Sequence, residues 1–470
     1  MPPTIATVVF LFGILGLFVL DRDPKVRTSK ALWIPVMWLL INGSRPVARW
    51  LQMGPAMDSP EAILDGSPLD ALVFASLLAA GLIVLAARGR QVGELLRANG
   101  PLLVFFLYCA ISVLWSEYPF VAFKRWTKAL GDLVMVLIVL TDPDRNTAIK
   151  RLLARTGFVL FPLSILLIRY HGDWGRGYDP WDGAVRYVGV TTNKNALGMI
   201  CLVFGLGALW RFDQVYRGEK STLRTKHLIA QSVVVALVLW LLGIANSMTS
   251  LACFALGATL IVLTSYFALA RQRAVLHILV ATLLLVACSP VFFEFGSSLT
   301  AAVGRDPTLT GRTEIWTLVL GMAGSPLVGT GYESFWLGQR LENVWNLYHF
   351  HLNGSHNGYI EVYVNLGWVG IAMLAAIMVA GYRDIVSSFQ RDPDTARLRL
   401  AYFVAAAAYS LTEVGFRMMS PIWIFFLFAV TSIPKAHVPH VAAEWQAESW
   451  PLWSTTASPV PAKASEPARF

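Results

Sequence analysis

Long runs of apolar residues recur along this chain and constrain its fold more than any other feature. A helix that crosses a membrane needs about 20 mostly apolar residues. Two weaker segments, 31–42 and 129–141, and eleven stronger ones together predict about 12 to 13 spans. The stronger segments are 4–20, 69–87, 101–115, 152–169, 195–210, 227–246, 250–270, 274–293, 359–382, 398–414 and 420–432. The sequence therefore predicts an all-α polytopic membrane protein.

The distribution of lysine and arginine predicts the orientation, because cytoplasmic loops are enriched in these residues. If segment 293–356 faces outward, the inward loops hold 21 Lys and Arg in 71 residues, and the outward loops hold 12 in 132. We therefore expect a membrane domain over 1–434 that includes a large helical periplasmic loop, 293–356. Segment 435–470, rich in Ala, Pro, Ser and Thr, is expected to be a disordered cytoplasmic tail.

Composition argues against several other classes of protein. The net charge of +9 is explained by the inward loops, so no nucleic-acid partner is expected. The four cysteines lie in apolar runs without metal-site spacing, and we expect no metal and no cofactor. The glycines of 324–335 lack the GxxxxGK[ST] spacing of a phosphate-binding loop, and we expect them to be turn residues.

Two outward loops carry cations against the topology rule. An anionic substrate at the outer face would explain them, although those of 116–128 also fit an anchoring role at the membrane interface. Within the first loop, Lys128 and Asp132 are spaced i, i+4 and are expected to pair. The cations are Lys124, Arg125 and Lys128 in 116–128, and Arg176, Arg186 and Lys194 in 170–194.

The large loop contains a predicted amphipathic helix with Thr310 as its N-cap. Its apolar residues recur at i, i+3, i+4 and i+7, which are Ile315, Leu318, Val319 and Met322. Arg312 falls in the first turn, where free backbone N–H groups and a guanidinium together make a good phosphate cradle. The alternative is an interfacial arginine that reaches toward lipid headgroups.

His356 precedes the predicted span 359–382. A neutral imidazole is a natural general base near neutral pH. The alternative is a histidine that caps its own helix.

Several ordered motifs in this chain resemble the O-antigen ligase and polymerase superfamily, most closely its exopolysaccharide polymerases of the ExoQ type. The likeness covers roughly residues 30–430. The motifs are 311–316, 326–332, 356–359 and 366–367, with further likeness at 115–119, 123–128 and 189–198.

The resemblance implies a metal-independent glycosyltransferase with a GT-C-like fold in the bacterial inner membrane. The donor would be an oligosaccharide on undecaprenyl diphosphate at the periplasmic face, which the enzyme would polymerise into exopolysaccharide or O-antigen. His356 and Arg312 match the catalytic histidine and one arginine of the family. The other arginine maps to Arg186, with Lys194 as a neighbouring alternative. Arg125 would help to bind the diphosphate.

Other functions stay open at the level of sequence. The family also includes ligases, which transfer the glycan to a different acceptor, so the acceptor is undetermined. Chain-length regulator and export proteins are further expected partners, besides membrane lipid. A transporter or flippase of lipid-linked glycans is a less favoured alternative. A peptidoglycan-type glycosyltransferase would need a carboxylate, for which Asp173, Asp179 and Asp182 are the candidates.

Overall fold

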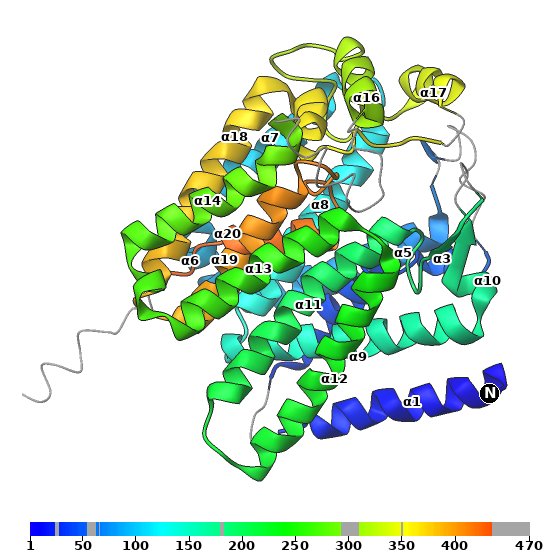
Figure 1. Cartoon of the computed structure of the whole chain (residues 1–470). Coiled ribbons are helices and arrows are strands. Elements are labelled where there is room, and N and C mark those ends of the chain that lie inside the picture. The colour runs from blue at the N-terminus through cyan, green and yellow to red at the C-terminus, as the bar shows by residue number, and fades with distance from the viewer. Residues whose placement is uncertain are drawn as a thin grey trace, which may run out of the picture. The chain divides into compact units, whose positions relative to one another are not determined.

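Helices dominate the protein, as Figure 1 shows. The computed structural model describes residues 1–23, 28–53, 63–64, 66–178, 183–292, 310–348 and 351–434. The expected tail 435–470 and residues 293–309 of the large loop lie outside these ranges, as do Asp179 and Asp182. The helices of the N-terminal half are α1 (Pro3–Leu20), α2 (Trp33–Asn42), α3 (Val47–Trp50), α5 (Pro68–Ala87), α6 (Gly89–Ala98), α7 (Gly100–Ile111), α8 (Pro119–Leu140), α9 (Arg145–Tyr170) and α10 (Gly172–Gly175).

The second half is helical as well. Its helices are α11 (Lys194–Arg217), α12 (Thr222–Ala245), α13 (Met248–Tyr266), α14 (Arg273–Phe292), α16 (Thr310–Gly321), α17 (Gly338–Leu347), α18 (Gly358–Ser388), α19 (Pro393–Tyr409) and α20 (Pro421–Val430). Between α10 and α11, strands β1 (Arg176–Tyr178) and β2 (Val185–Tyr187) form an antiparallel hairpin. Short 3-10 turns at Lys30–Leu32, Ser112–Trp115 and Ala268–Arg271 complete the described elements.

The helices confirm a polytopic membrane protein. In the described part of the chain, seven helices are long and apolar enough to cross a membrane, namely α1, α5, α9, α11, α12, α13 and α18. An eighth arises if α6 and the segment 100–115, which are bent by 92°, form one span. Segments 30–42, 273–289 and 421–430 are shorter apolar helices, and α8 and α19 carry charged residues. The sequence-based count includes these shorter and charged helices, so it exceeds the number that length and composition alone support.

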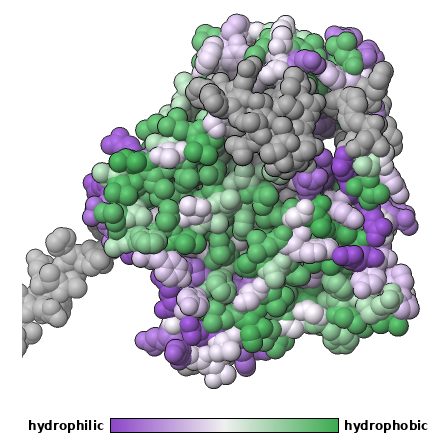
Figure 2. All heavy atoms as spheres, viewed as in Figure 1, coloured by the Kyte–Doolittle hydropathy of each residue, from purple (hydrophilic) through white to green (hydrophobic). Residues whose placement is uncertain are grey.

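An apolar band crosses the face of the helices that Figure 2 shows. Figure 2 shows hydrophobic residues across the middle of the visible face and hydrophilic residues gathered toward both ends. Individual side chains agree, since Phe12 of α1 is 69% exposed and Ile83 of α5 is 71% exposed. Lipid covers such faces in a membrane, so their exposure is expected.

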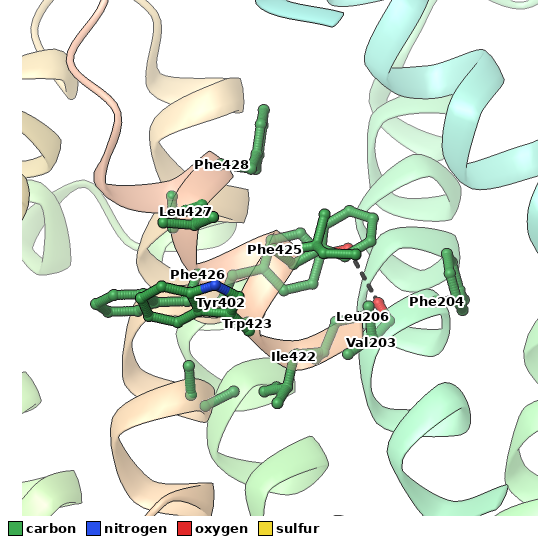
Figure 3. Packing of buried hydrophobic residues seen from close by; sticks show 14 of the residues in the cluster. Val203, Phe204, Leu206, Tyr402, Ile422, Trp423, Phe425, Phe426, Leu427 and Phe428 are labelled. Carbon is green, nitrogen blue, oxygen red and sulfur yellow. Dashed lines mark hydrogen bonds between the residues drawn. The ribbon is translucent and has the colours of Figure 1, made fainter. Parts of the chain in front are cut away.

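Aromatic packing among α11, α19 and α20 forms part of the buried core (Figure 3). The Tyr402 hydroxyl of α19 donates a hydrogen bond of 2.9 Å to the carbonyl of Val203 on α11. Phe425 of α20 packs against both the Tyr402 ring, at 4.8 Å between centroids, and Phe204, at 5.6 Å. The buried hydroxyl therefore has its partner, which avoids the penalty for an unpaired polar group.

Loops that the sequence analysis assigned to one side of the membrane contact one another. On the predicted inward side, Arg211 pairs with Asp21 at 2.7 Å. Arg88 of loop 88–100 likewise lies 3.9 Å from Asp142 of loop 142–151. On the predicted outward side, Arg340 of the large loop lies 2.8 Å from Glu117 of loop 116–128. These contacts support the predicted alternation of the loops.

A break in α18 positions the large loop. Gly367 has φ +65° inside α18, where the backbone leaves helical geometry. The backbone of 326–331 crosses this break: Trp368 N–H donates to the carbonyl of Pro326, and Gly331 N–H donates to that of Asn365. A Cβ on Gly367 would lie 2.2 Å from the Leu327 carbonyl oxygen. Gly329 and Gly331, which the sequence analysis expected to be turn residues, have φ of +68° and +96° and lie in the segment that makes these contacts.

The expected pairing of Lys128 with Asp132 is wrong. The Asp132 carboxylate accepts hydrogen bonds from the Trp38 indole at 2.9 Å and from Met419 N–H at 2.7 Å. Among the described residues no ion pair joins it to Lys128. Two partners distant in sequence therefore replace the local partner that helical spacing favours.

Candidate functional site

The Glu413 carboxylate brings together side chains from distant parts of the chain. One oxygen, Oε1, lies 3.1 Å from Arg312 Nη2 and 3.2 Å from Asn195 Nδ2. The other oxygen, Oε2, lies 3.2 Å from His356 Nδ1. Arg312 also donates to the carbonyl of Thr412. The start of α11, the start of α16, the turn before α18 and loop 411–420 therefore converge on one carboxylate.

Helix α16 places Arg312 at this point. Ile315 and Val319 are buried and pack in a small apolar cluster that includes Phe335, Trp336 and Val364. This burial supports the predicted amphipathic helix, and Arg312 lies in its first turn as expected. Its side chain remains 28% exposed. In Figure 1, α16 lies at the top of the helices with α17.

The turn before α18 fixes His356 through its neighbours. Ser355 donates from both its N–H and its hydroxyl to the buried Glu361 carboxylate, at 3.1 and 2.9 Å. Asn357 caps α18, because its side chain accepts from the N–H groups of Tyr359 and Ile360. The capping role that was the alternative for His356 thus falls to the next residue. His356 itself has φ +50°, a backbone conformation that is uncommon outside glycine and tends to occur at functional sites.

The contact with Glu413 determines which nitrogen of His356 carries the proton. An ionised carboxylate only accepts hydrogen bonds, so Nδ1 carries the proton in this contact. Nε2 of a neutral imidazole then keeps its lone pair. With the side chain 35% exposed, this arrangement is that of an oriented general base, in which a carboxylate also stabilises the imidazolium that forms.

A second group of charges borders the same loops. Arg417 Nε lies 3.3 Å from Glu333 Oε2, and Arg417 Nη1 donates to the carbonyl of Asn353 at 3.0 Å. Arg125 of α8 donates to the carbonyl of Glu333. Burial by itself would lower the pKa of Arg417, but the carboxylates of Glu333 and Glu361 outweigh it, and the pKa is raised. Arg417 is therefore a permanent cation.

The other predicted site residues lie on β2, α11 and α8. Arg186 is on β2, opposite Gly177 in the hairpin. Lys194 is the first residue of α11, next to Asn195. Neither contacts Glu413 in the described part of the chain. Arg125 likewise contacts the Glu333 backbone and not Glu413.

Sequence reasoning missed three residues at this site. Glu413 lies at the end of the predicted span 398–414, and nothing in the local sequence links it to Arg312 or His356. Asn195 lies within a quoted motif, and Arg417 was counted only as loop charge. Among the described residues, no three His, Cys, Asp or Glu side chains converge in a way that could hold a metal ion.

Comparison with known proteins adds independent information. A family model described as O-antigen ligase matches residues 233–375. This stretch includes Arg312 and His356 and ends before Glu413. The chain is also 28% identical over 305 residues to the exopolysaccharide production protein ExoQ of Rhizobium meliloti (strain 1021), an alignment that covers 62% of this chain and 67% of that protein. The chain is therefore similar to the O-antigen ligase family and to an exopolysaccharide production protein, and both likenesses support a membrane polymerase or ligase of glycans.

Proposed function

We propose that this protein polymerises oligosaccharide repeat units carried on undecaprenyl diphosphate, at the periplasmic face of the inner membrane. The observation that carries the proposal is the shared contact of Arg312 and His356 with Glu413. The likeness to an exopolysaccharide production protein favours polymerisation. The distribution of lysine and arginine favours a periplasmic site.

The proposed reaction is glycosyl transfer with a diphosphate leaving group. A hydroxyl oxygen of the acceptor glycan attacks the anomeric carbon of the donor, and the bond from that carbon to the phosphate oxygen breaks. The electron pair leaves with the lipid diphosphate. The hydroxyl proton passes to His356 Nε2. Because the diphosphate is already a good leaving group, the protein mainly has to stabilise developing charge and position the acceptor.

Arg312 is suited to the leaving group. A guanidinium has five N–H donors, and in this structure two of its nitrogens contact Glu413 and Thr412. Its remaining donors and its partial exposure allow contact with a phosphate oxygen. Arg186, Lys194 and Arg125 remain proposed substrate-binding residues, and Lys194 is the nearest of the three in sequence to a Glu413 contact.

Glu413 links the two roles in this proposal. In the unliganded protein it neutralises Arg312 and fixes the His356 tautomer. A bound diphosphate would compete with Glu413 for Arg312 and would leave the carboxylate free to stabilise the imidazolium. Charge would thus be stabilised where it develops during the reaction.

Complementation of a deletion strain tests the proposal. His356→Ala and Arg312→Ala are each expected to abolish polymer while the protein stays in the membrane, and to leave single repeat units on the lipid carrier. The matched controls are His351→Ala, whose ring stacks on Trp345, and Arg224→Ala, which donates to carbonyls at the predicted inward end. Both controls should keep normal polymer. Normal polymer length in the His356 and Arg312 variants would rule out the site.

The family model's description favours a second candidate, an O-antigen ligase. The same strains separate the two activities. Accumulated single units on the carrier indicate loss of a polymerase, whereas accumulated full-length polymer on the carrier indicates loss of a ligase. Loss of a flippase would instead prevent the lipid-linked units from reaching the outer face.

A further inference from the structure

Arg45, in the loop that follows α2, closes the base of the β1–β2 hairpin. Its Nη2 donates to the carbonyl of Trp174, two residues before β1, and at 3.1 Å to the carbonyl of Gly189, two residues after β2. The N–H groups of Val188 and Gly189 in turn donate to the carbonyl of Gly175, both at 3.0 Å. One guanidinium nitrogen therefore links the two ends of the hairpin segment.

Two tryptophans hold the Arg45 guanidinium in place. The rings of Trp50 and Trp174 are stacked, with 5.6 Å between centroids and 12° between planes. The Arg45 Cζ atom lies 5.2 Å from the Trp50 centroid and 5.5 Å from the Trp174 centroid, within the range of cation–π attraction. Trp50 belongs to α3 and Trp174 to α10, which lie side by side in Figure 1. The arginine and both rings therefore join the hairpin base to α3.

The burial of Arg45 is unfavourable in itself. The residue is 5% exposed, and burial and the neighbouring Arg49 lower its pKa to about 10. Its Nη1 is buried without a hydrogen-bond partner, and an unpaired buried donor costs stability. An apolar side chain could fill this position without that cost. The contacts of Arg45 with both ends of the hairpin therefore indicate a role other than packing.

The hairpin cannot fix the position of Arg186 by itself. Its strands pair over three residues each, and an isolated two-stranded hairpin is only marginally stable. Arg186 stands opposite Gly177, which has no side chain to pack against it. The position of Arg186 therefore depends on the contacts at the hairpin base.

The chain between the hairpin and α11 is also held by short-range contacts. The Thr191 hydroxyl lies 2.7 and 3.0 Å from the carbonyls of the residues three before it and two after it. Asn193 caps α11, and Asn195 in the first turn of α11 contacts Glu413. Because this connection is short and ordered, a change at the hairpin base would move Arg186 relative to the Glu413 carboxylate.

We propose that Arg45 is a positioning residue for the glycosyl donor, because it holds Arg186 where the guanidinium of Arg186 binds the lipid diphosphate. Arg45 does not contact the substrate and acts through Arg186. The inference rests on the proposed function, in which Arg186 is a substrate-binding residue. It adds that donor binding depends on a buried arginine in a different loop.

Binding of undecaprenyl diphosphate to the purified full-length protein tests the inference without relying on catalysis. Arg45→Met fills the same space but removes the donors, and it should weaken binding about tenfold through loss of the Arg186 contact. Arg45→Lys keeps a charged donor without the planar stacking and should weaken binding less, which also serves if the methionine variant folds poorly. Arg169→Met is the matched control, because Arg169 also lies over a tryptophan, 5.2 Å from the Trp240 centroid, and this variant should bind normally.

A double variant separates positioning from a general loss of stability. Arg186→Ala should weaken binding about as much as Arg45→Met does. Adding Arg45→Met to Arg186→Ala should then change the affinity by less than about twofold, because the interaction through which Arg45 acts is already absent. Unchanged binding in Arg45→Met, or losses that add in the double variant, would overturn the inference.

The proposed function is tested separately by His356→Ala. This variant should bind undecaprenyl diphosphate normally while forming no polymer. Normal polymer in His356→Ala would refute the proposed reaction, whereas the dependence of lipid binding on Arg45 would still stand.

Discussion

Glu413→Gln offers the sharpest test of the site, because it removes one charge and almost no volume. The glutamine keeps one carbonyl oxygen, so it can accept from Arg312 or from His356 but not from both. The amide nitrogen then faces whichever donor remains. Glu413 is 7% exposed, and water can therefore do little to replace the lost acceptor.

The distance between the two groups sets the expected magnitude. A full charge pair at the observed 3.2 Å between His356 Nδ1 and Glu413 is worth about 1 kcal/mol in water and about 5 kcal/mol at an effective dielectric constant of 20. The imidazole is 35% exposed, so we take an intermediate value of about 3 kcal/mol for stabilisation of the imidazolium. At about 1.4 kcal/mol per factor of ten, this predicts roughly a hundredfold lower kcat.

The assay is polymer formation from lipid-linked repeat units in membranes that contain equal amounts of each variant. Glu413→Asp should be intermediate, because the shorter side chain keeps the charge but reaches one partner less well. Glu117→Gln is the matched control, since this carboxylate also pairs with an arginine, Arg340 at 2.8 Å, but is 60% exposed. A kcat for Glu413→Gln within threefold of the unmodified protein would refute the role assigned to the carboxylate.

Two further substitutions test the packing that positions the site. Gly367→Ala places a Cβ 2.2 Å from the Leu327 carbonyl oxygen at φ +65°, and we expect a loss of about 1–3 kcal/mol, measured as a lower melting temperature in detergent. Gly243→Ala, with nothing within 4 Å of the new Cβ, is the control and should not lower it. Tyr402→Phe removes the buried hydrogen bond to Val203 and should cost about 1 kcal/mol; an unchanged melting temperature would contradict this.

Features that depend on local sequence were predicted well. The apolar period after Thr310 gave the helix α16, and Ile315 and Val319 are on its buried face. The turn at 356–358 was expected to precede a long helix, which α18 confirms. Hydrophobic patterning and capping act within a few residues, so a sequence contains the information that determines them.

Features that depend on tertiary contacts were not predicted. Glu413 is separated by 101 residues from Arg312 and by 57 from His356, and no spacing rule connects positions so far apart. Asp132 is a second case, in which local spacing predicted a partner that the structure does not show. Helical spacing favoured Lys128, whereas its partners are Trp38 and Met419, which are 94 and 287 residues away.

Loop 411–420 explains why the two charged groups adjoin. Glu413 and Arg417 are four residues apart in this loop. Each is paired with a residue of opposite charge from the large loop. The hydrogen bond that Met419 N–H donates to Asp132 also connects this loop to α8. A movement of α8 would therefore shift Arg417 and Glu413 together. The short connection between α19 and α20 therefore joins three parts of the site: His356 as the proposed base, Arg312 as the proposed diphosphate-binding residue, and the ion pair of Arg417 with Glu333.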